Sequence, residues 1–450
     1  MQTTFGKRNW WLLLFFGLIG QIAWSVENMF FNLFVFDEVE QNLSVITLMV
    51  QLSGVMATIA TLIAGTISDK TGNRRAFICW GYIIWGITVA LFGSLSPNKM
   101  GKLFSLSGER AITFCLIAVV VGDCIMTLFG STANDACFNA WVTDNTRTEF
   151  RGKVESILSV LPLISMLIVA GGFGILQTIL GYFGLFLALG IVISLCGIVG
   201  LFTLQDNPTL TKSGAFKDIV YGFKPSIIKS NPPFYLTLCV IGVYSIACQI
   251  FMPYLIIYMK TYLGFSVLEY SLVFGAAIIL GAIANVIFGK YADKLDKVKC
   301  MYVAAACLSL GLLGMYFVKG IDKVPLLLLF GIAGFVMITG FILFSALSNA
   351  VVRDYTPQEN AGKLQGVRMV FSVLLPMLLG PMIGNTINKV RNIPLENAGA
   401  DAMTTQYVPA PEIFLAGAIF TLLVFALLPL LSSSIKKQQT FDKENDYDAT

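Results

Sequence analysis

The sequence predicts an all-α membrane protein with twelve transmembrane helices in two pseudo-symmetric six-helix bundles and both termini in the cytoplasm. Three observations predict this class. Of the 450 residues, 56% are hydrophobic and only 12% are charged, whereas soluble domains carry about 25% charged residues. Twelve apolar segments reach the length of about 20 residues that a helix needs to cross the hydrocarbon layer. Two sequence patterns recur in the second half of the chain, which indicates a duplicated unit.

The apolar segments place the predicted spans, and the charges between them predict the orientation. In chain order the spans are 10–36, 43–67, 77–95, 111–137, 154–178, 182–204, 234–260, 267–290, 301–319, 324–350, 366–388 and 412–433. Most Lys and Arg residues fall on the side of the termini, which is therefore cytoplasmic. The predicted domains are a bundle over 1–204, a cytoplasmic linker over 205–233, a bundle over 234–434 and a disordered tail over 435–450. Pro253 predicts a kink in the seventh span.

Composition excludes several classes of function. The chain has no histidine, which excludes imidazole metal ligands and histidine-based catalytic triads. A net charge of +4 is too small for a nucleic-acid footprint. The sequence contains no P-loop and no soluble stretch large enough for an enzyme domain. We therefore expect a monomeric plasma-membrane protein without catalytic activity, cofactor, metal or nucleic acid, whose partners are lipid and a small molecule.

One repeated pattern follows the second and eighth spans. It comprises Gly65, Asp69, Lys70, Gly72, Arg74 and Arg75 in the first half, and Gly289, Asp293 and Lys294 in the second. The glycine would let two helices approach closely, and the aspartate can face basic residues and the positive N-terminus of a neighbouring helix. By symmetry we expect that neighbour to be helix eleven for Asp69 and helix five for Asp293. Such contacts would close an inner gate and bias the outward-open state; the alternative is a solvated loop that only sets topology.

A second repeated pattern lies after the fourth and tenth spans. Asn139, Val142 and Asp144 are followed by Gly152, and Asn349, Val352 and Asp354 are followed by Gly362. Since both patterns occupy corresponding predicted inner loops, they support a duplication of six helices.

Three acidic residues fall inside the predicted spans. They are Glu27 on helix one and Asp123 and Asp135 on helix four. Intramembrane acids are costly and are functional candidates for that reason, and no Lys or Arg lies deep in a span to pair with them. We predict that Asp123 and Asp135 carry a coupling proton or sodium ion, and that Glu27 borders the solute. The alternative is a protonated acid that only hydrogen-bonds within the fold.

Polar and aromatic side chains on three helices predict a solute site. They are Gln21, Trp24, Glu27, Asn28 and Asn32 on helix one, Tyr244, Gln249 and Tyr254 on helix seven, and Asn349 on helix ten. Aromatic rings stack on the apolar faces of sugars, and hydroxyl groups need hydrogen-bond partners. The alternatives are interhelical hydrogen bonds and, for the tyrosines, anchoring at the membrane interface.

On these residues the chain resembles the major facilitator superfamily of secondary transporters over essentially its whole length. The family's loop signature, Gly-x-x-x-Asp-Arg/Lys-x-Gly-Arg-Arg/Lys, is matched at the positions given above, with Asn73 departing at one basic position. The stretch NDACFNAWVTDNTRTEFRGKVESI resembles the glycoside–cation symporters of the melibiose-carrier branch, and Asp135 aligns with their helix-four aspartate. That branch holds sodium partly through aspartates on helix two, where this chain has Gln51, Ser53 and Thr58.

The resemblance implies secondary active transport of a sugar or glycoside by alternating access, coupled to H⁺ or Na⁺. Two alternatives stay open at this point. One is a drug or lipid exporter of the same superfamily, which the aromatic content also fits. The other is a non-transporting membrane sensor of the same solute, against which the short loops and tail argue.

Overall fold

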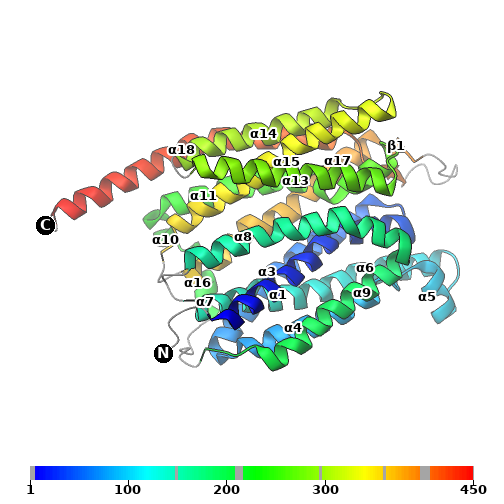
Figure 1. The fold of residues 1–450 in the computed structure, drawn as a ribbon, viewed down its shortest axis with the longest axis horizontal. Helices are drawn as coiled ribbons and strands as arrows, with labels where there is room; N and C mark the ends of the chain where they lie inside the picture. The colour runs from blue at the N-terminus through cyan, green and yellow to red at the C-terminus, as the bar shows by residue number, and fades with distance from the viewer. Residues whose placement is uncertain are drawn as a thin grey trace. The chain divides into compact units, whose positions relative to one another are not determined.

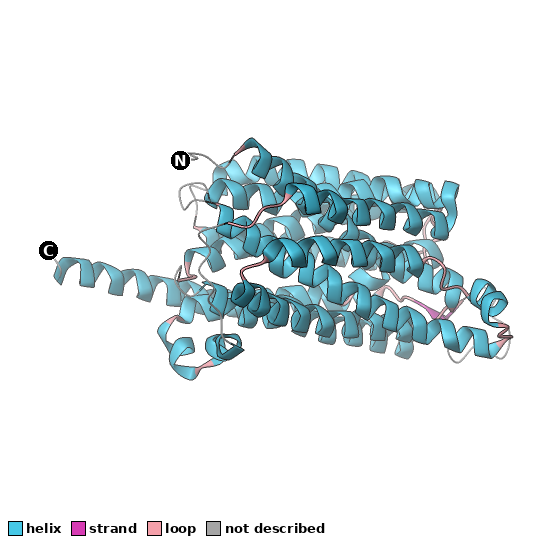
Figure 2. Cartoon of the chain, turned by 90° about the horizontal axis from the view of Figure 1, so that it is seen from below, coloured by secondary structure: helices cyan, strands magenta, loops and turns pink. Residues whose placement is uncertain are grey.

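The computed structural model describes residues 6–146, 151–207, 216–292, 296–357, 361–395 and 406–448. Almost all of these residues are helical, as Figure 2 shows. Within these ranges, eleven helical segments are long and apolar enough to cross a membrane. The all-helical, multi-pass membrane class predicted from composition is therefore confirmed. The chain forms two compact units.

The first unit takes Met1–Phe216, Met252–Gly275 and Asn385–Ala410. Its N-terminal part consists of α1 (Lys7–Val26), η1 (Glu27–Phe31), α2 (Asn32–Phe34), η2 (Val35–Val39), α3 (Leu43–Thr71), α4 (Arg74–Phe92), α5 (Pro97–Phe104), α6 (Glu109–Gly130), η3 (Ser131–Phe138), α7 (Asn139–Asn145), α8 (Arg151–Ile168), η5 (Val169–Phe173) and α9 (Gly174–Thr203). To it are added η7 (Met252–Tyr254), α12 (Leu255–Thr261), and the paired strands β1 (Ile393–Pro394) and β2 (Tyr407–Val408). α4 packs along α9, α3 along α6, and α1 along α8 (Figure 1).

Local sequence explains where α3 and α4 begin and end. Asn42 caps α3, because its side chain accepts from the Ser44 N–H at 3.0 Å. Gly72 ends that helix with φ 68°, a left-handed conformation that glycine adopts without steric cost. Asn73 then caps α4 by accepting from the Ala76 N–H. The turn that carries the repeated Asp-Lys pattern is thus built by a glycine and an asparagine.

Glycines bring α4 and α9 into backbone contact. A Cβ atom at Gly86 would lie 2.4 Å from the Gly190 carbonyl oxygen, and one at Gly190 would lie equally close to the Gly86 carbonyl oxygen. Any side chain there would collide with main-chain atoms, so these positions admit only glycine. Close approach through small residues is the usual way in which helices associate in a membrane.

Several helices in the first unit contain a π-helical turn, in which the hydrogen bonds run from i to i+5. These turns are η1, η2, η3 and η5. Glu27 begins η1 and Asp135 lies within η3. π-Helical turns are rare and occur frequently at functional sites. Two of the three intramembrane acids therefore stand at irregular points of their helices.

The second unit takes Lys217–Phe251, Ala276–Gly384 and Pro411–Thr450. Its complete helices are α10 (Pro225–Ser230), α11 (Pro232–Gln249), α14 (Lys297–Phe317), α15 (Lys323–Asp354), α16 (Ala361–Met369), η9 (Val370–Leu374) and α18 (Glu412–Asp448). Three further helices lie mostly in this unit: η6 (Phe216–Phe223), α13 (Val267–Ala292) and α17 (Leu375–Arg391). α14 packs on α15, and α18 packs on both α11 and α14.

The helix bounds differ from the predicted spans at three places. The fifth and sixth predicted spans form one helical stretch over Val160–Thr203, with non-helical backbone at Gly181 (φ 67°, ψ 173°). The seventh is interrupted at η7, which contains the expected kink residue Pro253. α18 continues to Asp448, where the sequence predicted a disordered tail from residue 435. After Pro429 this segment contains neither Gly nor Pro and includes several Leu, Lys and Gln residues, which favour helix.

The predicted domain boundaries also differ from the two compact units. The bundle predicted over 1–204 lies within the first unit, but that unit also includes residues 252–275 and 385–410 from the second half of the sequence. The predicted linker over 205–233 contributes α10 and lies partly outside the described residues. The division into two six-helix bundles stays a prediction.

Candidate functional site

The centre of the first unit contains a cluster of four buried polar side chains. Glu27 comes from η1, Ser53 from α3, and Asp123 and Thr127 from α6; their exposed fractions are 8%, 3%, 2% and 1%. Glu27 Oε1 accepts from Ser53 Oγ at 3.2 Å and from Thr127 Oγ1 at 3.1 Å. The two hydroxyl oxygens lie 2.7 Å apart. The structure thus unites Glu27 and Asp123, to which the sequence had given separate roles.

Each carboxyl group in this cluster has one oxygen without a hydrogen-bond partner among the described residues. These oxygens are Glu27 Oε2 and Asp123 Oδ1. Buried polar atoms without a partner are uncommon and call for a physical explanation. The Asp123 carboxyl interacts electrostatically with Glu27 and lies beside the Ser53 hydroxyl. An isolated buried charge is very costly, so a pair of acids in such a place normally holds a proton or a cation.

Asp135 lies in η3 beside an aromatic pair rather than inside the four-residue cluster. The Trp24 indole lies beside its carboxyl group, and the Trp24 ring packs on Trp85 with centroids 5.0 Å apart. Asp135 and Trp24 are both half-buried. Gly130 leaves room for the two indoles, because a Cβ atom there would lie 2.8 Å from Trp85 and 3.1 Å from Trp24.

The polar stripe predicted on helix one is partly used for packing. Asn28 is exposed and donates to the Trp24 carbonyl oxygen at 2.8 Å, while Asn32 is buried and donates to the Asn28 carbonyl oxygen at 3.0 Å. Ser25 forms a 2.9 Å hydrogen bond with Ser165 of α8. Gln21 is half-buried. Gln21, Trp24, Asn28 and Asn32 therefore stay predictions for solute contact; Asn32 Oδ1 is buried and has no hydrogen-bond partner among the described residues.

Tyr244 and Gln249, predicted to bind solute from the second half of the sequence, are packed against neighbouring helices. Tyr244 is buried, donates to the Phe341 carbonyl oxygen at 2.7 Å and stacks on Phe344 with centroids 4.4 Å apart. Gln249 packs where α11 meets Gly380, at which a Cβ atom would lie 2.4 Å from the Gln249 side chain. Solute binding by these residues stays a prediction.

Asn349 and Tyr254 each have a named side-chain partner. Asn349 accepts from the Arg368 guanidinium at 3.0 Å within the second unit. The Tyr254 hydroxyl is fully buried in the first unit and lies 2.8 Å from Thr47 Oγ1. Arg368 lies inside a candidate membrane helix, Leu364–Arg391.

The repeated loop patterns form an ion pair within each unit. In the first unit the buried Arg74 binds Asp69, and its Nε lies 3.0 Å from Asp144 Oδ2. In the second unit Lys297 Nζ lies 2.5 Å from Asp354 Oδ2. Asp144 and Asp354 occupy the same position of the second repeated pattern. A cation at the start of one helix thus binds the matching aspartate at the end of another in both units.

Other residues of the first loop pattern have diverse surroundings. Lys70 is exposed, and the Arg75 N–H donates to Asp206 Oδ1 at 2.9 Å. At Gly65 no described atom lies within 4 Å of the position of a Cβ atom, and the close helix contact expected there stays a prediction. Gly289 lies near the end of α13, and Asp293 and Lys294 lie outside the described residues. Closure of an inner gate by these motifs stays a prediction.

A second charged cluster in the first unit was not predicted from the sequence. Lys260 Nζ of α12 lies 2.6 Å from Asp37 Oδ2 of η2, and the Tyr182 hydroxyl donates to the same oxygen at 2.5 Å. The side chains of Asp37 and Lys260 are 17% and 38% exposed. This cluster joins a segment of the second sequence half to the N-terminal helices. Asp37 stands at the end of the first span, where an acid is ordinarily interpreted as a solvated residue.

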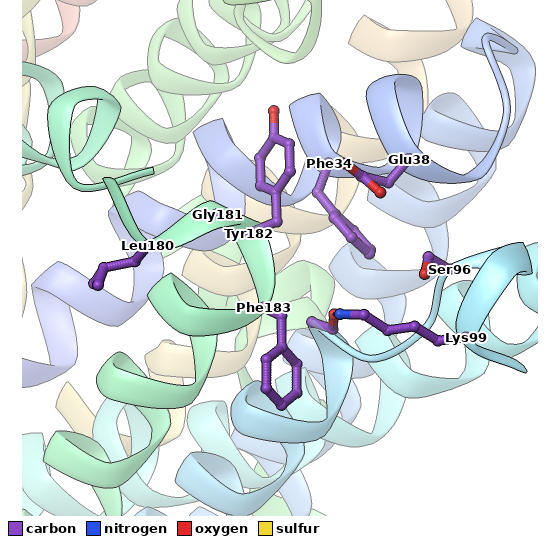
Figure 3. Close-up of a pocket in the computed structure, with 9 residues that line it drawn as sticks. Phe34, Glu38, Ser96, Lys99, Leu180, Gly181, Tyr182 and Phe183 are labelled. Carbon is purple, nitrogen blue, oxygen red and sulfur yellow. The ribbon is translucent and has the colours of Figure 1, made fainter. Parts of the chain in front are cut away.

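A small cleft lies beside this second cluster, away from the buried acids. Figure 3 shows Glu38, Ser96, Lys99 and Tyr182 around it, and Gly181 at the break in α9. Lys99 Nζ lies 4.2 Å from the centroid of the Phe183 ring. The cleft has a volume of about 200 Å³, below the roughly 300–1,000 Å³ typical of ligand pockets. We do not assign the solute to it.

Solved structures with a similar fold are membrane transporters. A point mutant of the nucleoside transporter NupG matches with a TM-score of 0.68 and 10% identity, covering 94% of this chain and 99% of its own. A bacterial homologue of the human lysosomal transporter Spinster matches with a TM-score of 0.66 and 13% identity, over 96% and 98% of the two chains. A bacterial homologue of the iron transporter ferroportin matches with a TM-score of 0.61 and 14% identity, over 94% and 98%.

These identities establish the fold but not the substrate. A comparison with curated protein sequences gives no match. The family model of the Major Facilitator Superfamily matches residues 13–381, which is most of the sequence. Together with the eleven apolar helices, this match shows that the protein is a multi-pass integral membrane protein of transporter type. The chain belongs to the Major Facilitator Superfamily.

Proposed function

We propose that this protein is a secondary active transporter that moves a small polar solute, a sugar or glycoside, by alternating access coupled to H⁺ or Na⁺. It acts as a monomer in the plasma membrane. The observation that carries the proposal is the buried acidic cluster of Glu27 and Asp123, which lies in the same unit as Asp135 and Trp24. Buried acids that can gain and lose charge are what ion-coupled transport requires.

The solute class follows from the chemistry around Trp24. Its half-buried indole is held between Trp85 and the Asp135 carboxyl group, and the exposed Asn28 lies one turn further along the helix. A ring surface next to hydrogen-bonding groups suits a polyhydroxylated molecule, since sugars have both apolar faces and hydroxyl groups. The melibiose-carrier resemblance around Asp135 supports the same class.

Twelve membrane crossings with cytoplasmic termini are part of the proposal. The helical stretch Val160–Thr203 contains 44 residues and a break at Gly181. At a rise of 1.5 Å per residue it would be about 66 Å long, roughly twice the hydrocarbon thickness. Counting it as two crossings gives twelve instead of eleven, and the excess of Lys and Arg in alternate loops supports the orientation.

Uptake into proteoliposomes tests the function directly. Purified protein is supplied with radiolabelled glycosides, sugars and, because NupG transports nucleosides, nucleosides, each with an inward pH gradient, a sodium gradient or neither. We expect accumulation of a glycoside only when an ion gradient is present. Accumulation of nucleosides but no sugar would overturn the substrate class, and absence of any gradient-dependent uptake or counterflow would overturn the transport proposal.

Asp135→Asn provides a sharper version of this test. A neutral amide can still hydrogen-bond the Trp24 indole or a solute, but it cannot cycle charge. We expect gradient-driven accumulation to be lost and counterflow without a gradient to be retained. Glu109→Gln, an exposed acid at the start of α6, is the matched control and should accumulate solute like wild type. Normal accumulation by Asp135→Asn would exclude Asp135 from coupling.

A further inference from the structure

The cluster of Glu27, Ser53, Asp123 and Thr127 has fewer hydroxyl protons than oxygen contacts. Glu27 Oε1, Ser53 Oγ and Thr127 Oγ1 form a closed triangle with sides of 2.7, 3.1 and 3.2 Å. Each hydroxyl group supplies one proton, so two protons serve three contacts. The Asp123 carboxyl beside Ser53 is a further acceptor for the same proton. A complete hydrogen-bond network therefore needs at least one more proton, which only a carboxyl group can hold.

The electrostatic surroundings of the cluster also call for a positive partner. Asp135 adds a further negative charge that acts on Glu27, and the Cys124 thiol lies near both Glu27 and Asp123. In the elements packed around the cluster, the other titratable groups are directed elsewhere: Tyr254 of η7 to Thr47, and Tyr82 of α4 to Asn134 and Phe16. No described lysine or arginine forms an ion pair with either acid. Two adjacent carboxylates without a cation would be very costly in this place.

The distances favour a proton over a metal cation. Separations of 2.7 to 3.2 Å between oxygens are those of hydrogen bonds. A cation bound to oxygens at about 2.3–2.6 Å, as calcium is, keeps adjacent octahedral ligands about 3.3–3.7 Å apart. Sodium is of similar size and would have to push these three oxygens apart. A proton on Glu27 Oε1, or on the Asp123 oxygen beside Ser53, would supply the missing donor, whereas Glu27 Oε2 and Asp123 Oδ1 make none of these contacts.

We infer that Glu27 and Asp123, bridged by Ser53 and Thr127, form the proton-binding site of this transporter and that H⁺ is its coupling ion. The inference rests on the proposed transport function and moves Glu27 from the solute to the ion. In the coupling step, the O–H bond of one carboxyl group breaks, the electron pair stays on that oxygen, and the proton leaves to water on the open side. Reprotonation from the other side completes the cycle.

Infrared difference spectroscopy of the purified protein tests the site without knowledge of the solute. The C=O stretch of protonated carboxyl groups is followed in D₂O during pH titration, with NaCl or choline chloride at equal ionic strength. We expect a titrating band that is unaffected by Na⁺, loses intensity in Glu27→Gln and in Asp123→Asn, and is unchanged in Glu109→Gln. Ser53→Ala and Thr127→Val keep both acids and should shift the frequency of the band, because each removes a hydrogen bond to it.

Three results would overturn the inference. The first is a band that disappears or changes its titration when Na⁺ replaces choline, because the site would then be a sodium site. The second is a band that both Glu27→Gln and Asp123→Asn leave intact. The third is a band unaffected by Ser53→Ala and by Thr127→Val. These variants keep both acids, so the result does not depend on whether the protein folds after losing a carboxyl group. If the expected spectra are obtained but the proteoliposomes show no gradient-dependent uptake or counterflow, the proposed transport function is wrong and the proton site still stands.

Discussion

Replacing Lys260 by Met should loosen the first unit where α12 meets the N-terminal helices. Lys260 Nζ lies 2.6 Å from Asp37 Oδ2, to which Tyr182 also donates. Exposed ion pairs contribute about 0.2–1 kcal/mol, whereas breaking a buried pair costs about 3–5 kcal/mol. With exposed fractions of 38% and 17%, this pair falls between these cases. We expect a loss of about 1–2 kcal/mol, which raises the ratio of molecules with this contact open to molecules with it formed about 5- to 30-fold.

Thr47 near the start of α3 reports on this change. It is buried and lies 2.8 Å from the Tyr254 hydroxyl, so Thr47→Cys should react with an impermeant maleimide only when this end opens. Lys260→Met and Asp37→Asn should each raise the labelling rate about 5- to 30-fold. The double variant should add nothing, because both changes remove one interaction. Lys102→Met, an exposed lysine on the same predicted side, is the control. Unchanged labelling, or two fully additive effects, would refute the reasoning.

Three further predictions concern topology, the loop motif and packing. Lys70→Cys should react with impermeant label from the cytoplasmic side and Lys102→Cys only from outside; the reverse pattern would invert the topology. Asp69→Asn weakens the contact between the half-exposed Asp69 and Arg74. A loss of about 1 kcal/mol should lower turnover about fivefold while solute affinity is retained, and unchanged turnover would argue against a gate. Gly130→Ala forces a Cβ atom to within 2.8 Å of an indole and should lower the free energy of unfolding by about 1–3 kcal/mol, measured by thermal denaturation. Gly65→Ala, with open space around it, should be neutral or slightly stabilising, and equal losses in both variants would contradict the packing argument.

The sequence predicted those structural features that depend on a single helix or a single turn. Apolar runs located the membrane helices, and the repeated loop patterns marked Arg74, Asp144 and Asp354, which the structure places in ion pairs: Arg74 with Asp144, and Asp354 with Lys297. The pairing itself was not predicted, because the two patterns lie far apart in the chain. A duplicated sequence shows that two sites are equivalent, but it does not show which of their parts are in contact.

Contacts that depend on helix rotation and on distant segments could not be predicted. Glu27, Ser53 and Thr127 come from three different helices, and helical spacing within one segment does not show which faces of separate helices meet. Asp37 and Lys260 are separated by 223 positions, and nothing in local composition links them. The two residues fall in different sequence halves, which sequence reasoning had treated as separate domains.

The buried position of Glu27 and Asp123 also has an electrical consequence. Moving one elementary charge across the whole membrane is worth about 2.3 kcal/mol per 100 mV, and a charge that moves part of the way experiences a corresponding fraction. Both acids lie away from the ends of their helical stretches, so a proton entering or leaving them must cross part of the membrane's voltage drop. With H⁺ as the proposed coupling ion, a negative interior would therefore draw protons inward through this site even at equal pH on both sides. A cell could then accumulate solute from its resting potential alone.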